Sequence, residues 1–158
     1  MRLVDAQTHH GVLVSSSVIR NLIREGNLPL ANKLLTRSFF IDGTIVHGHH
    51  RGTALGIHTA NIKTDNELLP PDGVYATFAT IDHKKYASAT NIGKNPTFDD
   101  VERSIECHIF NFDKDLYGKK IRVTFEQKIR DEIRFASPKA LVKQIEKDIA
   151  ETKKILRV

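Results

Sequence analysis

The chain has 158 residues, of which 40% are apolar and 27% charged, so it can bury about one hydrophobic core. Its single cysteine, Cys107, excludes a disulfide framework and a four-thiolate zinc site, which is typical of a reducing compartment such as the cytoplasm. No apolar run is long enough to cross a membrane, and no secretion signal is recognisable, so we expect no membrane partner. The net charge of +5 suits nucleic acid or a polyphosphate ligand equally. Because the basic residues are scattered, we expect no nucleic-acid partner.

Two short helices are predicted near the N-terminus. Serines 15–17 offer an N-cap ahead of apolar residues at helical spacing, and Gly26 suits the end of that helix. Pro29 fits the first turn of a second helix, which ends near Leu35. The character of the sequence then changes, which predicts a helical segment, 1–36, followed by a second domain, 37–158.

The second domain is predicted to be mainly β. Strand-like runs occur at Phe39–His47 with an interruption at Asp42–Gly43, at Gly73–Asp82, from Tyr86, at Ser104–Phe112 and at Lys120–Ile129. No helices separate these runs, which excludes a parallel α/β sheet and favours an antiparallel sheet or a closed barrel. A last helix begins at Ser137 and Pro138. Its apolar stripe is expected to cover the barrel and comprises Leu141, Ile145, Ile149 and Ile155.

A glycine-punctuated stretch, 52–61 (GTALGIHTAN), fits neither a helix nor an ordinary core strand. Its two glycines let the backbone approach another group closely, and Thr59 and Asn61 place two oxygen-bearing side chains on one side of an extended segment. These features suit phosphate oxygens and a hard cation such as Mg²⁺. The alternative is a capped turn between two strands.

Glu106 is the first candidate for chemistry, because it is a carboxylate within an otherwise apolar strand. Burial would poise such a group as a general base, whereas alternation alone would make it a solvent-facing residue of a one-sided sheet. A second candidate is the stretch 91–98 (NIGKNPTF), which reads as a stiff loop with polar groups to aim at a ligand. A third is 130–135 (RDEIRF), where charges and an aromatic ring could contact a flat polar ligand, or could be solvated surface.

Four histidines invite a metal hypothesis: His47, His49, His50 and His58. Imidazole is a good zinc ligand, and two of these residues share a side if the first strand continues that far. No acidic residue or cysteine joins them at ligand spacing, so a transition-metal site is the minor alternative.

Several motifs, in this order, together resemble the riboflavin kinase family. They are Val46-His-Gly48, Arg51-Gly52, Leu55-Gly-Ile-His-Thr-Ala-Asn61, Asp72-Gly-Val-Tyr75, Asn91 to Phe98, Ile105-Glu-Cys-His-Ile109, Asp115-Leu-Tyr-Gly118 and Arg130 to Phe135. The resemblance runs from about Thr36 to the C-terminus. It implies a six-stranded antiparallel Greek-key barrel that transfers the γ-phosphoryl group of ATP, as its Mg²⁺ complex, to the 5′-hydroxyl of riboflavin to give FMN.

The resemblance also implies roles for individual residues. Glu106 would accept the proton of the 5′-hydroxyl, and Thr59 and Asn61 would bind Mg²⁺ and phosphate. The phosphate cradle would comprise Gly48, Arg51, Gly52 and Gly56. The residues near the flavin would be Asn91, Asn95, Thr97, Arg130 and Glu132.

The segment before Thr36 resembles the tail of the FMN adenylyltransferase module in bacterial bifunctional enzymes. The rest of that module, with its HxGH motif, is absent, so we expect no FAD synthesis by this chain alone and a possible separate adenylyltransferase partner. A monomer or weak oligomer is expected.

Within the glycine loop, His58 stands where the family usually has proline, and His50 and Thr53 stand where bacterial relatives often have a basic residue. These departures predict weaker ATP affinity. They also keep open an alternative in which the chain is a flavin- or nucleotide-binding sensor that has lost catalysis.

Overall fold

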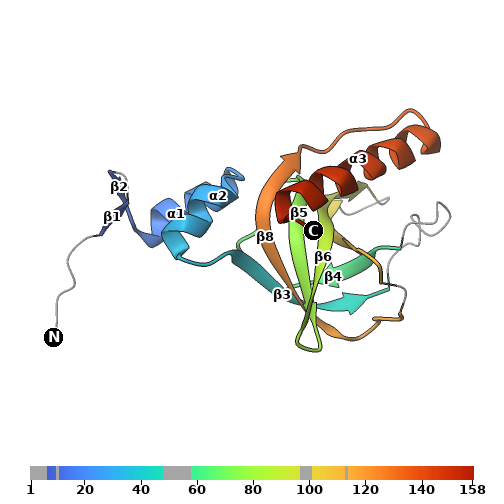
Figure 1. Cartoon of the computed structure of the whole chain (residues 1–158), viewed down its shortest axis with the longest axis horizontal. Helices are drawn as coiled ribbons and strands as arrows, with labels where there is room; N and C mark the ends of the chain where they lie inside the picture. The colour runs from blue at the N-terminus through green and yellow to red at the C-terminus, as the bar shows by residue number, and fades with distance from the viewer. Residues whose placement is uncertain (1–6, 10, 48–57, 97–100, 113) are drawn as a thin grey trace.

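The protein is a closed barrel of six strands with two short helices beside one end and a long helix along its side (Figure 1). The computed structural model describes residues 7–9, 11–47, 58–96, 101–112 and 114–158. In order around the barrel, the strands are β3 (Phe39–Val46), β4 (Ala60–Lys63), β7 (Val101–Ile109), β6 (Lys84–Pro96), β5 (Gly73–Ile81) and β8 (Lys120–Arg130). The helices are α1 (Ser16–Arg24), α2 (Leu28–Leu35) and α3 (Pro138–Leu156), and a small hairpin of β1 (Thr8–His9) and β2 (Val12–Leu13) precedes them.

Every neighbouring pair of barrel strands is antiparallel, and the connectivity is that of a Greek key. Strands β5, β6 and β7 form a meander, and β8 returns to lie beside β5. β4 closes the barrel by pairing with β3 on one side and β7 on the other. The prediction of a mainly β, six-stranded antiparallel barrel with flanking helices is confirmed.

Two expectations about the strands are wrong. β3 runs through Asp42 and Gly43 without a break, because Gly43 lets Lys63 and Ile62 of β4 come so close that a Cβ at position 43 would lie 2.6 Å from each. The predicted loop at 91–98 is instead strand as far as Pro96. The alternation of β6 continues through Ile92, which is fully buried inside the barrel, and residues 91–96 pair with β7.

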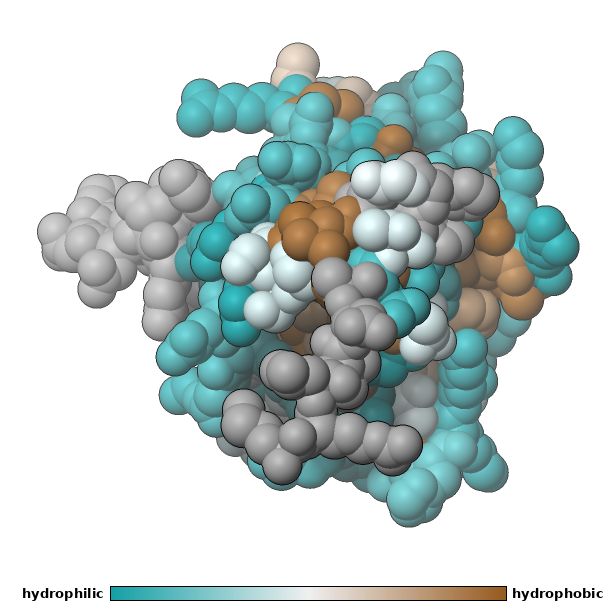
Figure 2. All heavy atoms as spheres, turned by 90° about the vertical axis from the view of Figure 1, so that its left-hand side faces the viewer, coloured by the Kyte–Doolittle hydropathy of each residue, from teal (hydrophilic) through white to brown (hydrophobic). Residues whose placement is uncertain are grey.

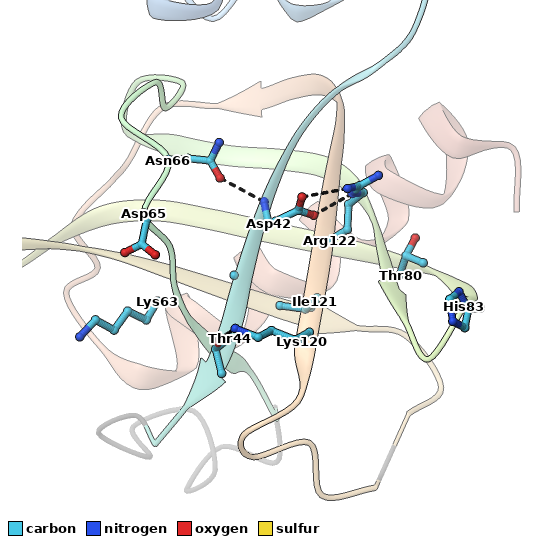
Figure 3. A pocket seen from close by; sticks show the side chains of 11 residues that line it. Asp42, Thr44, Lys63, Asp65, Asn66, Thr80, His83, Lys120, Ile121 and Arg122 are labelled. Atoms are coloured by element: carbon cyan, nitrogen blue, oxygen red, sulfur yellow. Dashed lines mark hydrogen bonds and ion pairs between the residues drawn. The ribbon is translucent and has the colours of Figure 1, made fainter.

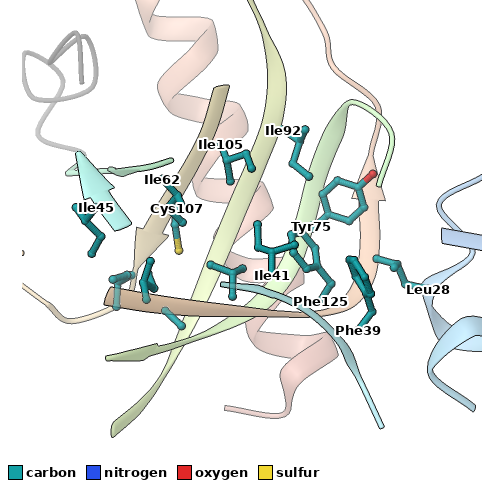
Figure 4. Close-up of a cluster of buried hydrophobic side chains, with 14 of the residues drawn as sticks. Leu28, Phe39, Ile41, Ile45, Ile62, Tyr75, Ile92, Ile105, Cys107 and Phe125 are labelled. Carbon is teal, nitrogen blue, oxygen red and sulfur yellow. The ribbon is translucent and has the colours of Figure 1, made fainter. Parts of the chain in front are cut away.

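The helices α1 and α2 share their hydrophobic core with the barrel. Leu28 is fully buried and lies with Phe39, Tyr75 and Phe125 at one end of the barrel interior (Figure 4). Asn32 of α2 also forms hydrogen bonds with the backbones of β3 and β8 at that end. Its amide donates to the Phe125 carbonyl at 2.9 Å, and its Oδ1 accepts from the Phe39 N–H at 2.8 Å. Seen from the N-terminal side, hydrophilic residues surround a small apolar area (Figure 2).

Hydroxyl groups line part of the barrel interior. The Thr77 hydroxyl lies 2.8 Å from the hydroxyls of Ser88 and Thr90, and all three residues are fully buried. Burial raises the pKa of the neighbouring Cys107 thiol, which therefore stays protonated. These mutual hydrogen bonds satisfy polar groups that would otherwise be costly inside the barrel.

Helix α3 packs on the outside of β5, β6 and β8, but not chiefly through its apolar stripe. Its buried residues are Asp148 and Thr152, whereas Leu141, Ile145 and Ile149 are half-buried. The reason is Arg130, at the end of β8. Its guanidinium reaches α3, where Nη2 lies 2.7 Å from Asp148 Oδ2 and Nε lies 3.0 Å from Oδ1. A half-buried cation needs a paired carboxylate. Asp148, and not an apolar residue, is therefore the side chain of α3 that is buried against the barrel at this point.

We predict that Asp148→Ala lowers the free energy of unfolding by about 3 kcal/mol, because it leaves the Arg130 charge unpaired in a site where its side chain is 19% exposed. Urea denaturation measures this change. The control is Glu151→Ala, which removes the partner of Lys154 in an exposed pair on the same helix and should change stability by less than about 0.5 kcal/mol. Equal effects of the two substitutions would contradict the prediction.

Candidate active site

Three polar side chains lie in one row on the outer face of the barrel. Glu106 of β7 is the direct cross-strand partner of Asn61 on β4 and of Asn91 on β6. The chain neighbours of these residues, among them Ile105 and Ile92, point into the core, so the row points outward. All three members are half-buried. Side chains that are direct partners across a ladder lie about 5 Å apart, which places one carboxylate between two amides.

The row is extended at the start of β4. Thr59 precedes Ala60 directly, so in extended backbone its side chain lies on the same face as that of Asn61. His108, two residues beyond Glu106 on β7, also faces this side. Its Nδ1 donates a hydrogen bond to the His58 carbonyl oxygen at 2.8 Å.

Glu132 meets the same face from the connection between β8 and α3. Its carboxylate lies directly over Gly93, two residues along β6 from Asn91. A Cβ at position 93 would lie 1.9 Å from Glu132 Oε1. A glycine is therefore required there for the close approach of the carboxylate, not for the turn predicted from the sequence.

Of the remaining predicted residues, two lie on β8 and β6 and five lie outside the described residues. Arg130 forms an ion pair with Asp148 of α3, and the backbone of Asn95 pairs with β7. The predicted residues outside the described ones are Gly48, Arg51, Gly52, Gly56 and Thr97.

Hard oxygen donors are available for a magnesium ion at the start of β4. Thr59 and Asn61 share the outer face, and a hydroxyl and an amide carbonyl are oxygen ligands that Mg²⁺ accepts, beside the Glu106 carboxylate. The zinc hypothesis gains no support within the described residues, among which no group of three or more His, Cys, Asp or Glu side chains could hold a metal. His47 stacks on Tyr117 with ring centroids 3.6 Å apart, and His49 and His50 lie outside the described residues.

An open groove of about 750 Å³ lies over β3 and β8 and is bordered by Lys63 of β4 (Figure 3). Lys63 lines it, two residues beyond Asn61 on β4, and is the cross-strand partner of Thr44 on β3. Lys120 of β8 donates to the Thr44 hydroxyl at 2.8 Å. On the far side, Arg122 donates to both carboxylate oxygens of Asp42 at 2.7 and 2.8 Å. These hydrogen bonds hold the pKa of Asp42 below its usual value, so Asp42 offsets the charge of Arg122, and the groove is also lined by Lys63, Lys120 and the acidic Asp65.

The comparisons with known proteins identify the family. The riboflavin kinase (Flavokinase) family matches residues 35–156. The chain belongs to the riboflavin kinase family. It is 39% identical over 150 residues to the bifunctional riboflavin kinase/FMN adenylyltransferase of Bacillus subtilis, covering 92% of this chain and 48% of that protein. It is also 43% identical over 135 residues to the trifunctional protein RibF/MnmA of Mycoplasmoides gallisepticum, covering 85% of this chain and 20% of that protein. The chain thus spans half or less of the length of these curated relatives.

Solved structures agree with the fold of this riboflavin kinase family member. A Streptococcus pneumoniae structure described as a macrolide-efflux protein superposes with a TM-score of 0.89 at 36% identity, over 95% of this chain and 50% of that one. Riboflavin kinase from Trypanosoma brucei superposes with a TM-score of 0.55 at 26% identity, over 75% of this chain and 79% of that one. None of the helices described in this structure is long and apolar enough to cross a membrane.

Sequence reasoning missed two features of the site. The alternation of β7 puts His108 on the face of Glu106, but its hydrogen bond to residue 58 depends on a register between strands about 50 residues apart. Gly93 was assigned to a loop, because nothing local shows that a carboxylate 39 residues later lies over it.

Two of the close glycine contacts, at Gly43 and Gly93, predict responses to alanine of different size. In Gly93→Ala the obstacle is the end of a flexible, exposed Glu132 side chain, so we expect the free energy of unfolding to change by less than about 1 kcal/mol as the carboxylate swings away. In Gly43→Ala the obstacle includes the Lys63 backbone, and we expect a loss of about 2 kcal/mol or more. Urea denaturation of both variants tests this, and a larger loss for Gly93→Ala would refute the assigned contact.

Proposed function

We propose that this chain is a working riboflavin kinase that transfers the γ-phosphoryl group of ATP to the 5′-hydroxyl of riboflavin, releasing FMN and ADP. The observation that carries the proposal is the direct pairing of Asn61 with Glu106, which puts an amide suited to phosphate and metal next to a carboxylate suited to a proton. Family membership supports the same reaction, since the bifunctional relatives carry riboflavin kinase in their names.

In the proposed reaction, Glu106 lies where it can accept the proton of the attacking hydroxyl. The hydroxyl oxygen forms a bond to the γ-phosphorus, the bond between that phosphorus and the β–γ bridging oxygen breaks, and ADP leaves with that electron pair. The proton ends on the Glu106 carboxylate. Since phosphoryl transfer is mostly positioning and charge neutralisation, the fixed cross-strand row supplies much of what the reaction needs.

Magnesium bound with ATP would neutralise phosphate charge. Thr59 and Asn61 would hold it, because they present hard oxygens on the face that Glu106 shares. Lys63, at the near edge of the groove, supplies a positive charge on the same strand. Gly48, Arg51, Gly52 and Gly56 remain the proposed phosphate cradle.

The flavin is proposed to lie on the other side of Glu106, toward β6. Asn91 flanks Glu106 there, and the Glu132 carboxylate lies over Gly93 next along the strand. Arg130 would contribute by anchoring the start of the segment that carries Glu132, through its ion pair with Asp148. Asn95 and Thr97 keep their proposed flavin roles.

Glu106→Gln is expected to lower the rate of FMN formation by about a hundredfold or more, because it removes the proton acceptor and keeps the side-chain shape. Protein incubated with riboflavin, Mg²⁺ and ATP is sampled over time, and FMN and FAD are separated by chromatography. Riboflavin binding, followed by quenching of flavin fluorescence, should survive in the variant.

The matched control is Glu146→Gln, which removes an exposed carboxylate of α3 and should leave the rate unchanged. The proposal expects FMN without FAD from the wild-type chain. Flavin binding with no FMN from the wild-type chain would overturn it and favour a binding module without catalysis.

His58→Pro is expected to lower the Michaelis constant for ATP roughly two- to fivefold, since a proline before Thr59 removes about 0.4–1 kcal/mol of backbone freedom. The substitution keeps the carbonyl that accepts from His108. Steady-state kinetics with varied ATP measures the constant. His58→Ala removes the imidazole without adding the proline ring, so it separates the two effects of the substitution. An unchanged Michaelis constant in His58→Pro would show that loop rigidity does not limit ATP affinity.

A further inference from the structure

His108 is a histidine on the site face with a contact that no predicted role explains. It lies on β7, two residues beyond Glu106, and it is half-buried. Its cross-strand partner on β6 is Ala89, a small residue that leaves room for the imidazole. The imidazole packs against the ring of Phe110, with 5.5 Å between the ring centroids. These contacts hold the imidazole against the sheet.

The hydrogen bond of this imidazole falls where the ladder between β4 and β7 stops. The ladder pairs Asn61 with Glu106 and Ala60 with Cys107, and β4 begins at Ala60. At the next position the His108 side chain supplies the contact between the two segments in place of a backbone pair, because its Nδ1 donates to the His58 carbonyl at 2.8 Å. The imidazole thus extends the attachment of this chain segment to β7 by one register position.

That hydrogen bond acts on Thr59 through the peptide group. The carbonyl of His58 and the N–H of Thr59 belong to one planar unit, so fixing the oxygen fixes the orientation of the plane. The trans geometry then directs the Thr59 N–H away from β7. The Cα of Thr59 lies in this plane, so the point from which the Thr59 side chain leaves the backbone is fixed with it.

We propose that His108 is a positioning residue for the magnesium-nucleotide site, which it serves by locking the peptide group that leads into Thr59. The inference rests on the proposed function for the assignment of Thr59 to that site. His108 contacts backbone and not the reacting groups, so its removal should weaken the nucleotide complex more than the flavin complex.

The test compares His108→Leu, which has no donor, with His108→Asn, whose Nδ2 stands at the same number of bonds from the backbone as Nδ1 of histidine. Isothermal titration calorimetry measures the affinity for ADP with Mg²⁺, and fluorescence quenching measures the affinity for FMN. We expect His108→Leu to weaken Mg·ADP binding at least tenfold, about 1.4 kcal/mol, and to leave FMN affinity within about twofold. His108→Asn should recover most of the loss. Lys147→Leu, on the exposed face of α3, is the control and should change neither affinity.

Unchanged Mg·ADP affinity in His108→Leu overturns the proposal, as does an equal loss of Mg·ADP and FMN affinity, which would indicate a merely structural role. If His108→Leu does not fold, nitrogen-15 NMR of the wild-type protein decides: the Nδ1–H tautomer in the Mg·ADP complex supports the proposal, and the Nε2–H tautomer overturns it. Failure of the proposed function has a separate signature, which is no FMN from the wild-type chain while His108→Leu still weakens Mg·ADP binding.

Discussion

The register of β4 against β7 is the constraint on which the rest of the site depends. β4 has four residues, and it closes the barrel through short ladders on both sides. Because side chains alternate along a strand, a slip of one residue would turn Asn61 into the core and Ile62 out to solvent. The burial of Ile62 between β3 and β7 therefore holds Asn61 beside Glu106. The hydrophobic core fixes the geometry of the polar row without touching it.

The Greek-key connectivity makes this arrangement possible. A meander of β5, β6 and β7 places Asn91 beside Glu106, but only the return of β7 to β4 adds Asn61, from a segment 45 residues earlier. Glu132 arrives by a third route, from the connection that follows β8. Three distant parts of the chain thus contribute to one outer face, and the closed barrel keeps them in place because none of its strands has a free edge in the sheet.

The local residue pattern predicts much of the fold and part of the site, and the features that it does not predict have physical causes. Alternation placed Glu106 on the solvent-facing side of its strand, since that depends only on the pleat. It could not identify the neighbours of Glu106, because register between distant strands is set by packing of the whole barrel. Gly93 was misread because a glycine in a strand and a glycine in a turn look alike when the group that approaches it is remote. The partner of Arg130 was missed for a similar reason. Asp148 sits on a helix face predicted to be apolar, and only the fold shows that a cation reaches it.

The sharing of the core between α2 and the barrel has a consequence for anyone who divides this protein for study. The family match begins at residue 35, which suggests a convenient place to cut. A chain starting there would lack Leu28 and Asn32, so the ring of Phe39 would lose an apolar neighbour, and its N–H and the Phe125 carbonyl would lose the amide that joins them. The start of the family match is therefore not a border of the hydrophobic core, and α1 and α2 belong with the barrel in any fragment meant to report on it.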